Sequence, residues 1–321
     1  MLVLCRFCVI NGVKDNSHMK SPYIISVGNL AMGGTGKTPF AIFLANLFMA
    51  EQRKTAILSR GYKGAIGLDT HVISDGKTLF HHPPQAADEP YMMALAVPGV
   101  IVITGKNRTA SFDLAMRDYA PEVFILDDAF QHRKMRRDVN IVLLDYKRPL
   151  STGFPFPFGY LREFPSALSR ADIIIFTRAT GTESPANVAK YCKGKSVYFS
   201  EFVYSHFIYN NQELPAEDLR GKEVWLMSGI AHNDKFHEQM LGYSVKISGH
   251  SRFNDHHKYT IDTLESVIAA ADKAGAAMII TTQKDFVKIP IGYRARFAYP
   301  VQAVNMLNQG FVEEILERVF I

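Results

Sequence analysis

The sequence has only three cysteines among 321 residues, and it lacks an internal repeat and a low-complexity tract. Cys5 and Cys8 form one C-x-x-C pair without a second pair, and Cys192 is distant, so a tetrahedral zinc site lacks its ligands. We interpret the cysteines as apolar thiols of a reducing compartment.

A stretch of roughly 20 apolar residues, as a membrane-spanning helix requires, is also missing. The first ten residues are apolar apart from Arg6, and no cleavage-site pattern follows them. We expect an interfacial anchor or a packed strand there.

Strong charge of either sign is lacking, since the formal net charge is +5. Residues 1–60 nevertheless contain seven lysines and arginines against two acidic residues. This basic end suits phosphates or an anionic membrane surface, and no interleaved aromatic and basic pattern favours nucleic acid. With 47% apolar and 21% charged residues the chain is globular, and its length indicates about two domains.

The most informative stretch is the segment SVGNLAMGGTGKTP at residues 26–39. It lies between an apolar run at 23–27 and a helical pattern over 38–50, which predicts a strand, a phosphate loop and a helix. The pattern G-x-x-x-x-G-K-[ST] is met except at Ala31. Lys37 is expected to reach the β and γ oxygens of a nucleotide, and Thr38 to bind Mg²⁺. The predicted nucleotide-binding residues are Asn29, Met32, Gly33, Gly34, Thr35, Gly36, Lys37 and Thr38.

Continuous apolar runs predict a doubly wound parallel sheet of the P-loop NTPase type, because strands buried on both faces lose the alternation of half-buried strands. These runs are residues 55–58, 100–104, 123–126, 139–144 and 171–177, with a helix expected over 106–119. Asp127 and Asp128 follow one of these strands, where an acidic partner of the phosphate loop would hold hydrated Mg²⁺. The alternative is that both aspartates cap a turn.

A second set of alternating elements predicts a smaller α/β lobe. We expect strands at 223–227, 243–247 and 276–281 and helices at 233–241 and 261–274. The predicted organisation is a kinase domain at 1–203, a hinge at 204–222 and a lobe at 223–321 that includes the C-terminal helix.

Four further features each have more than one interpretation. Asp88 begins a helical run and is either a helix cap or a functional carboxylate. His256 and His257 lie in a loop and suit either proton chemistry or a solvated surface. Six basic residues at 133–148 form a solvated rim or face a phosphorylated or membrane-borne substrate. The loop at 153–160 is rich in Phe, Pro and Gly, which indicates a contact with an apolar ligand, a lid or a satellite core cluster.

Taken in order, the motifs resemble those of the tetraacyldisaccharide 4'-kinases, the lipid A 4'-kinases of Gram-negative bacteria. The resemblance covers about residues 23–290. Besides the phosphate loop, it rests on Ser59-Arg60-Gly61-Tyr62, Asp88-Glu89-Pro90, Asp127-Asp128-Ala129-Phe130-Gln131-His132, Leu161-Arg162-Glu163, Asp255-His256 and Thr281-Thr282-Gln283-Lys284-Asp285.

The resemblance implies transfer of phosphate from MgATP to the 4'-hydroxyl of a tetraacylated glucosamine disaccharide 1-phosphate. The enzyme would act peripherally at the cytoplasmic face of the inner membrane, and we expect a monomer. It further implies that Asp88 is the general base with His256 as its partner, and that Glu163 lies in the site. Lys37 would offset phosphoryl charge, and Asp127 and Asp128 would lie near Mg²⁺.

Two departures from the family pattern stand out. Ala129 replaces the usual glycine of the acidic motif, so we expect a slightly altered turn. The segment ahead of the phosphate loop is short, so either other surfaces dock the protein or the start shown is incomplete.

Two other classes share some of these features. A GTP-driven switch shares the phosphate loop, but the glycine of its D-x-x-G switch motif is absent here. In Thr282-Gln283-Lys284-Asp285 the lysine is one position away from its place in the guanine-binding motif N-K-x-D. A non-catalytic ATP-binding scaffold needs no base near the γ-phosphate, so Asp88 discriminates against it.

Overall fold

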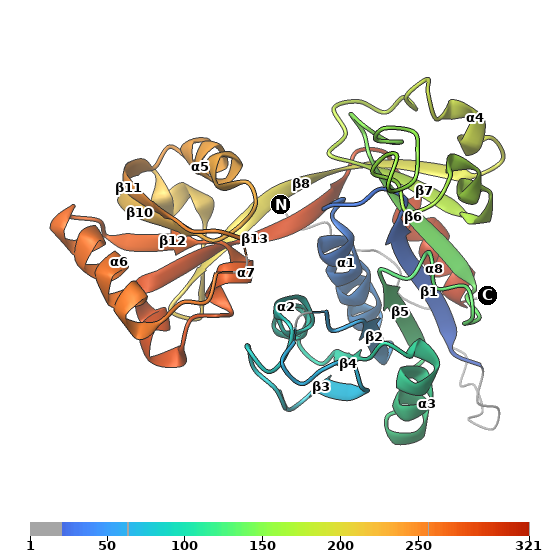
Figure 1. Cartoon of the computed structure of the whole chain (residues 1–321), viewed down its shortest axis with the longest axis horizontal. Coiled ribbons are helices and arrows are strands. Elements are labelled where there is room, and N and C mark those ends of the chain that lie inside the picture. Colours follow the sequence, from blue (N-terminus) through green and yellow to red (C-terminus); the bar gives the residue numbers. More distant parts are fainter. Residues whose placement is uncertain (1–20, 63, 256, 321) are drawn as a thin grey trace, which may run out of the picture.

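The computed structural model describes residues 21–62, 64–255 and 257–320. Its strands form one sheet in the order β11-β10-β12-β13-β8-β7-β6-β1-β5-β2-β4-β3, with β9 beside β8. Figure 1 shows this sheet dividing into a larger and a smaller lobe. The strands of the larger lobe are β1 (Tyr23–Asn29), β2 (Thr55–Ser59), β3 (His71–Asp75), β4 (Ile101–Thr104), β5 (Val123–Asp127), β6 (Val139–Asp145) and β7 (Ile173–Thr177).

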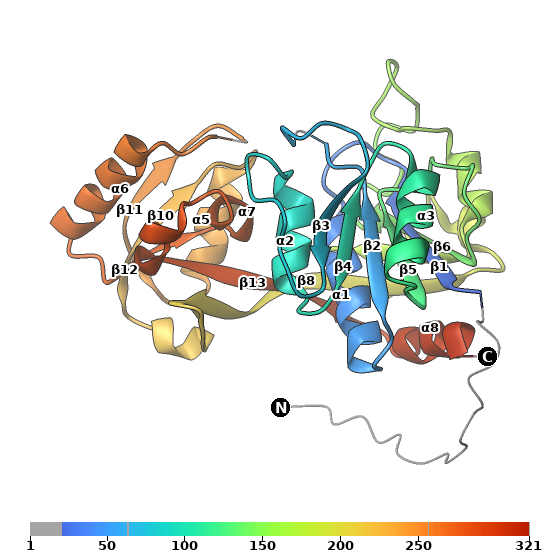
Figure 2. The ribbon, with the colours of Figure 1, turned by 90° about the horizontal axis from the view of Figure 1, so that it is seen from below.

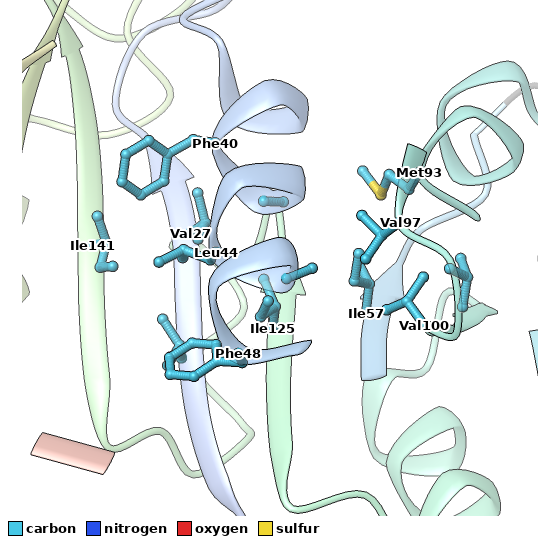
Figure 3. Packing of buried hydrophobic residues seen from close by; sticks show 14 of the residues in the cluster. Val27, Phe40, Leu44, Phe48, Ile57, Met93, Val97, Val100, Ile125 and Ile141 are labelled. Carbon is cyan, nitrogen blue, oxygen red and sulfur yellow. The ribbon is translucent and has the colours of Figure 1, made fainter. Parts of the chain in front are cut away.

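Both faces of the central strands of the larger lobe are buried. All of its strand pairs are parallel except β3 with β4, which confirms the predicted doubly wound sheet. Helices α1 (Lys37–Ala50) and α2 (Asp88–Ala96) cover one face, and α3 (Arg108–Asp118) covers the other. Figure 3 shows Phe40, Leu44 and Phe48 of α1 against the valine and isoleucine side chains of the sheet.

The smaller lobe repeats this layering on three strands, β10 (Glu223–Ser228), β11 (Lys246–Arg252) and β12 (Met278–Thr281). One face packs against α5 (Asn233–Leu241) and the other against α6 (Ile261–Lys273). Strand β11 begins three residues later than predicted. The shorter elements of the two lobes are α4 (Ala189–Cys192), α7 (Gln283–Phe286), β9 (Gln212–Leu214) and the short helices at Pro165–Arg170, Ala216–Leu219 and Ile291–Arg296.

The connection between the lobes is a pair of long antiparallel strands, β8 (Ser196–Tyr209) and β13 (Phe297–Met306). We expected a hinge at 204–222, but β8 continues through the first part of that segment. Its middle residues alternate between exposed and partly buried, because neither lobe covers this stretch completely. That weak alternation hides the strand in the sequence. Figures 1 and 2 show both strands crossing from one lobe to the other.

The C-terminal helix α8 (Phe311–Phe320) packs on the larger lobe, not on the smaller lobe as we predicted. Strand β13 carries the chain back to the larger lobe, since Met306 pairs with Ser200. The Phe311 ring then lies 5.6 Å from that of Phe40 in α1, and Figure 2 shows the two helices next to each other. The amphipathic pattern of α8 predicts its apolar face but does not identify the surface that covers it.

No helix within the described ranges is long and apolar enough to cross a bilayer. The apolar opening of the sequence, Cys5 and Cys8 lie outside the described residues.

Candidate active site

The phosphate loop joins the end of β1 to the start of α1. Gly33 and Gly36 have φ values of 105° and 85°, in the left-handed region that glycine adopts readily, and Gly36 is the N-cap residue of α1. Asn29 does not face outward: its Nδ2 donates to the carbonyl oxygens of Ala31 at 2.7 Å and Gly33 at 3.4 Å. Asn29 therefore shapes the loop from inside, whereas the first N–H groups of α1 are available to an anion.

Two residues far along the chain brace this loop. The Arg178 guanidinium donates to the Gly34 carbonyl oxygen at 2.7 Å and pairs with Asp145 at 2.9 Å. The Phe202 ring lies against Gly36, so closely that a Cβ atom on Gly36 would be 1.9 Å from Phe202 Cζ. Position 36 therefore requires glycine for space as well as for its φ. The sequence gives no signal for either contact.

The acidic pair lies at the carboxyl end of β5, as predicted. Asp127 is buried, and the Ser59 hydroxyl donates to its Oδ2 at 3.1 Å. Burial, together with the negative charges of Glu89 and Asp128, raises the pKa of Asp127 to about 7. Its Oδ1 has no hydrogen-bond partner among the described residues. A buried, unsatisfied carboxylate oxygen of this kind is a natural ligand for a cation.

Asp128 has a φ of 51° and is the centre of a small charge cluster. Its Oδ1 lies 2.7 Å from Arg162 Nη1 and 3.6 Å from Lys37 Nζ. The acidic motif and the phosphate loop are thus joined by an ion pair, and Arg162 is a site residue that we did not predict. The left-handed backbone falls on Asp128, while Ala129, at the position of the usual glycine, is buried beneath it.

A cavity of about 790 Å³ adjoins these groups, and residues of both lobes line it. Helix α2 of the larger lobe contacts α7, which lies beyond β12 of the smaller lobe. Glu89 lines the cavity beside Asp88 and was not predicted. The charged, polar and exposed apolar residues of the wall include Met32, Ser59, Arg60, Tyr62, Asp88, Glu89, Asp127, Asp128, Arg162, Lys258, Tyr259 and Lys288.

The predicted catalytic residues have different positions relative to this cavity. Asp88 lines it as the first residue of α2, while Ala87 occupies the N-cap position. His256 lies outside the described residues, but Lys258 and Tyr259, which follow it closely, are in the wall. Asp88 is therefore not the N-cap residue of α2, and residues close to both members of the proposed pair line one cavity.

Glu163, which we predicted to lie in the site, is not among the residues that line this cavity. Its carboxylate pairs with Arg170 at 2.7 Å and lines a separate hollow of about 590 Å³. Leu161 is buried, and Arg162 pairs with Asp128 at the cavity, so the next side chain is directed away from it. Arg162 and Glu163 are adjacent in the chain, but their side chains point to different places, Arg162 to Asp128 and Glu163 to Arg170.

The oxygen groups present fit a magnesium ion. Asp127, Asp128 and the Thr38 hydroxyl at the first turn of α1 carry hard oxygen atoms, the kind of ligand that Mg²⁺ prefers. The described residues contain no group of three or more metal-ligating side chains.

Comparison with known proteins agrees with this arrangement. The family described as LpxK, Tetraacyldisaccharide-1-P 4'-kinase, matches residues 1–320. The tetraacyldisaccharide 4'-kinase of Geobacter metallireducens is 38% identical over 300 residues, 92% of this chain and 88% of that protein. That of Desulfotalea psychrophila is 38% identical over 315 residues, 95% and 89% of the two chains.

A solved structure extends the likeness to three dimensions. The crystal structure of LpxK from Aquifex aeolicus, in complex with ATP, superposes with a TM-score of 0.80 at 32% identity. It covers 94% of this chain and 89% of that one. The predicted fold and the resemblance read from the motifs are confirmed. This chain is a kinase and belongs to the tetraacyldisaccharide 4'-kinase family.

Proposed function

We propose that this enzyme transfers the γ-phosphate of ATP to the 4'-hydroxyl of a tetraacyldisaccharide 1-phosphate in lipid A biosynthesis. The observation that carries the proposal is the single cavity whose wall contains Asp88, Asp127, Asp128 and Met32 of the phosphate loop. The names of the relatives and the ATP complex of the Aquifex protein support the substrates.

Binding of ATP follows from the start of α1. The N–H groups of the loop and the first turn would hold the β-phosphate, and Lys37 would leave Asp128 or bridge to it as the phosphates enter. Arg162 pairs with Asp128, so that carboxylate keeps a cationic partner when Lys37 turns to the nucleotide. The charge spread over the phosphoryl oxygens is then matched by groups that are already in position.

Asp88 is the proposed general base. It would accept the proton of the sugar hydroxyl as the new bond to γ-phosphorus forms, which a carboxylate positioned at the cavity wall can do. His256 would orient Asp88 and tune its pKa from the smaller lobe. Asp127, Asp128 and Thr38 would hold Mg²⁺, which when bound neutralises charge on the phosphate oxygens. Because the pKa of Asp127 is raised to about 7, its carboxyl group would have to lose its proton to serve as a cation ligand near neutral pH.

The same proposal includes a place in the cell. The protein would act as a peripheral monomer at the cytoplasmic face of the bacterial inner membrane, because its acceptor is a lipid held there. The basic bias of residues 1–60 supports contact with anionic lipid, and no feature favours nucleic acid as a partner.

The direct test incubates the purified chain with MgATP and a detergent-dispersed tetraacyldisaccharide 1-phosphate, and identifies the product by its phosphorus NMR signals. A second phosphate at the 4' position is the expected product. Lys37→Ala and Asp127→Ala should each lower turnover by about a hundredfold or more. Glu122→Gln, at the opposite end of β5, is the matched control and should retain activity. Absence of the product with the unaltered chain would overturn the proposal.

A further inference from the structure

The loop at 153–164, here called the aromatic loop, exposes five large aromatic side chains. No other stretch of this length among the described residues exposes as many large apolar side chains. Apolar groups gathered on a surface are costly in water and mark an interaction site. The exposed fractions are 59% for Phe154, 69% for Phe156, 88% for Phe158, 64% for Tyr160 and 61% for Phe164.

The loop is built to hold these side chains outward. Phe156 N–H donates to the Leu161 carbonyl at 3.0 Å, and Leu161 N–H donates to the Phe154 carbonyl at 3.1 Å. Gly159 N–H donates to the Pro155 carbonyl at 3.0 Å, and Leu161 itself is buried. These backbone groups are already paired, so they would enter an apolar medium without losing partners.

Basic residues lie beside the aromatic loop. Arg148 and Lys147 lie five and six residues before Gly153, the first residue of the loop, and both are exposed. Arg133 lines the same hollow as Pro155 and Phe164. Within the described ranges, no ion pair is formed by Lys147, Arg148 or Arg133. The nearby acidic groups are engaged, since Asp138 pairs with Arg136 and Asp145 with Arg178. An apolar tip with a net positive flank matches the interface of an anionic bilayer.

The aromatic loop is also attached to the phosphate loop. Met32 N–H donates to the Tyr160 carbonyl at 2.7 Å, and Arg162 N–H donates to the Leu30 carbonyl at 2.7 Å. Met32 is itself 46% exposed. A bilayer that holds the aromatic loop would therefore hold the edge of the ATP site at the membrane surface.

We infer that the aromatic loop is a membrane wedge: its aromatic side chains insert below the headgroups of an anionic bilayer, while Arg133, Lys147 and Arg148 contact the headgroups. The inference deepens the proposed function, because it names the surface through which the enzyme reaches a lipid acceptor. Its physical basis is independent of the phosphoryl transfer itself.

The first test is co-sedimentation of the full chain with vesicles of phosphatidylethanolamine and phosphatidylglycerol. Phe154→Ser combined with Phe158→Ser should raise the lipid concentration for half-binding by about tenfold or more. Ile291→Ser removes an equally exposed apolar side chain from the smaller lobe and should leave binding unchanged. Lys147→Gln with Arg148→Gln should weaken binding to these vesicles but not to pure phosphatidylcholine. Unchanged binding of the Phe154 and Phe158 variant would overturn the inference.

A second test places a reporter at the tip. Phe158→Trp should be quenched by vesicles of brominated lipid, well beyond the background of the single native tryptophan, Trp225. No added quenching would overturn the inference even if the chain binds vesicles through another surface.

With detergent-dispersed acceptor, the Phe154 and Phe158 variant should retain its kcat and KM. A raised KM there would instead assign the loop to the acyl chains of the acceptor. If the unaltered chain binds vesicles through this loop but phosphorylates nothing, the proposed function fails and the wedge stands.

Discussion

The Arg178 side chain donates a hydrogen bond of 2.7 Å to the carbonyl oxygen of Gly34, a residue 144 positions earlier in the chain. The same guanidinium pairs with Asp145 and lies over the Phe202 ring, which packs against Gly36. The ends of β6 and β7, together with Phe202 of β8, thus fix the shape of the phosphate loop before a nucleotide arrives.

We predict that Arg178→Ala weakens ATP binding more than it slows transfer. Loss of a charge-assisted hydrogen bond to a backbone carbonyl costs about 1.5–3 kcal/mol when it is fully formed, and partial exposure of Arg178 lowers that value. The KM for ATP should rise by about tenfold with a smaller change in kcat. Arg178→Lys keeps the charge and should recover part of the affinity. A fall in kcat as large as the rise in KM would argue that Arg178 contacts the transferring phosphate instead.

The buried carboxyl of Asp127 predicts a pH dependence of stability. Burial raises its pKa to about 7, so between the pKa of the unfolded chain and pH 7 the folded state binds more protons than the unfolded state. The contribution of Asp127 to the free energy of unfolding is therefore greatest at low pH, and it falls as the pH rises toward 7. The total change is about 4 kcal/mol as an upper limit.

Asp127→Asn tests this dependence in the absence of divalent cations. The variant should unfold at higher denaturant concentration than the unaltered chain at pH 8, and the difference should shrink on acidification to pH 5. Denaturant titrations at both values measure it. A variant that is less stable at pH 8 would show that Asp127 is ionised and well paired in the folded state.

The sequence predicts those parts of the fold that depend on local chemistry. Two-sided burial leaves continuous apolar runs, so β2, β5 and β6 are visible, and the phosphate loop follows from its glycines and Lys37. Asp127 is found because it ends the apolar run of a buried strand. Glycine turns and strand ends carry their signal within a few residues.

The remaining features depend on contacts between distant segments. Arg162 and Glu163 are adjacent and both charged, and only the packing of Leu161 decides which of them faces Asp128. The role of Arg178 requires knowledge of where Gly34 lies. The partner of α8 is set by the direction of β13, which the periodicity of neither element contains.

The position of α8 can be tested by a substitution in its buried face. Phe311 is buried against Phe40 and Tyr198, so Phe311→Ala should destabilise the larger lobe by about 3–5 kcal/mol. Hydrogen exchange should accelerate in α1 and leave α5 unchanged. Phe320→Ala, at the partly exposed end of the same helix, should have a much smaller effect. Faster exchange in α5 with α1 protected would place the helix on the smaller lobe.

Asp88 and His256 are predicted to act as one unit. Asp88→Ala and His256→Ala should both lower kcat, the second more mildly, and the double variant should be scarcely worse than Asp88→Ala alone. Steady-state kinetics of the four proteins measure this coupling. Losses that multiply would show two independent roles.

The most direct measurement for the proposed mechanism compares Asp88→Asn with the unaltered chain in two assays, single-turnover phosphate transfer and calorimetric ATP binding. The substitution keeps the shape of the side chain and removes its ability to accept a proton. We predict that transfer slows by about 10²–10⁴-fold while the Kd for ATP changes by less than about twofold. Near-normal transfer, or a loss that appears mainly in ATP binding, would contradict the assignment of Asp88 as the base.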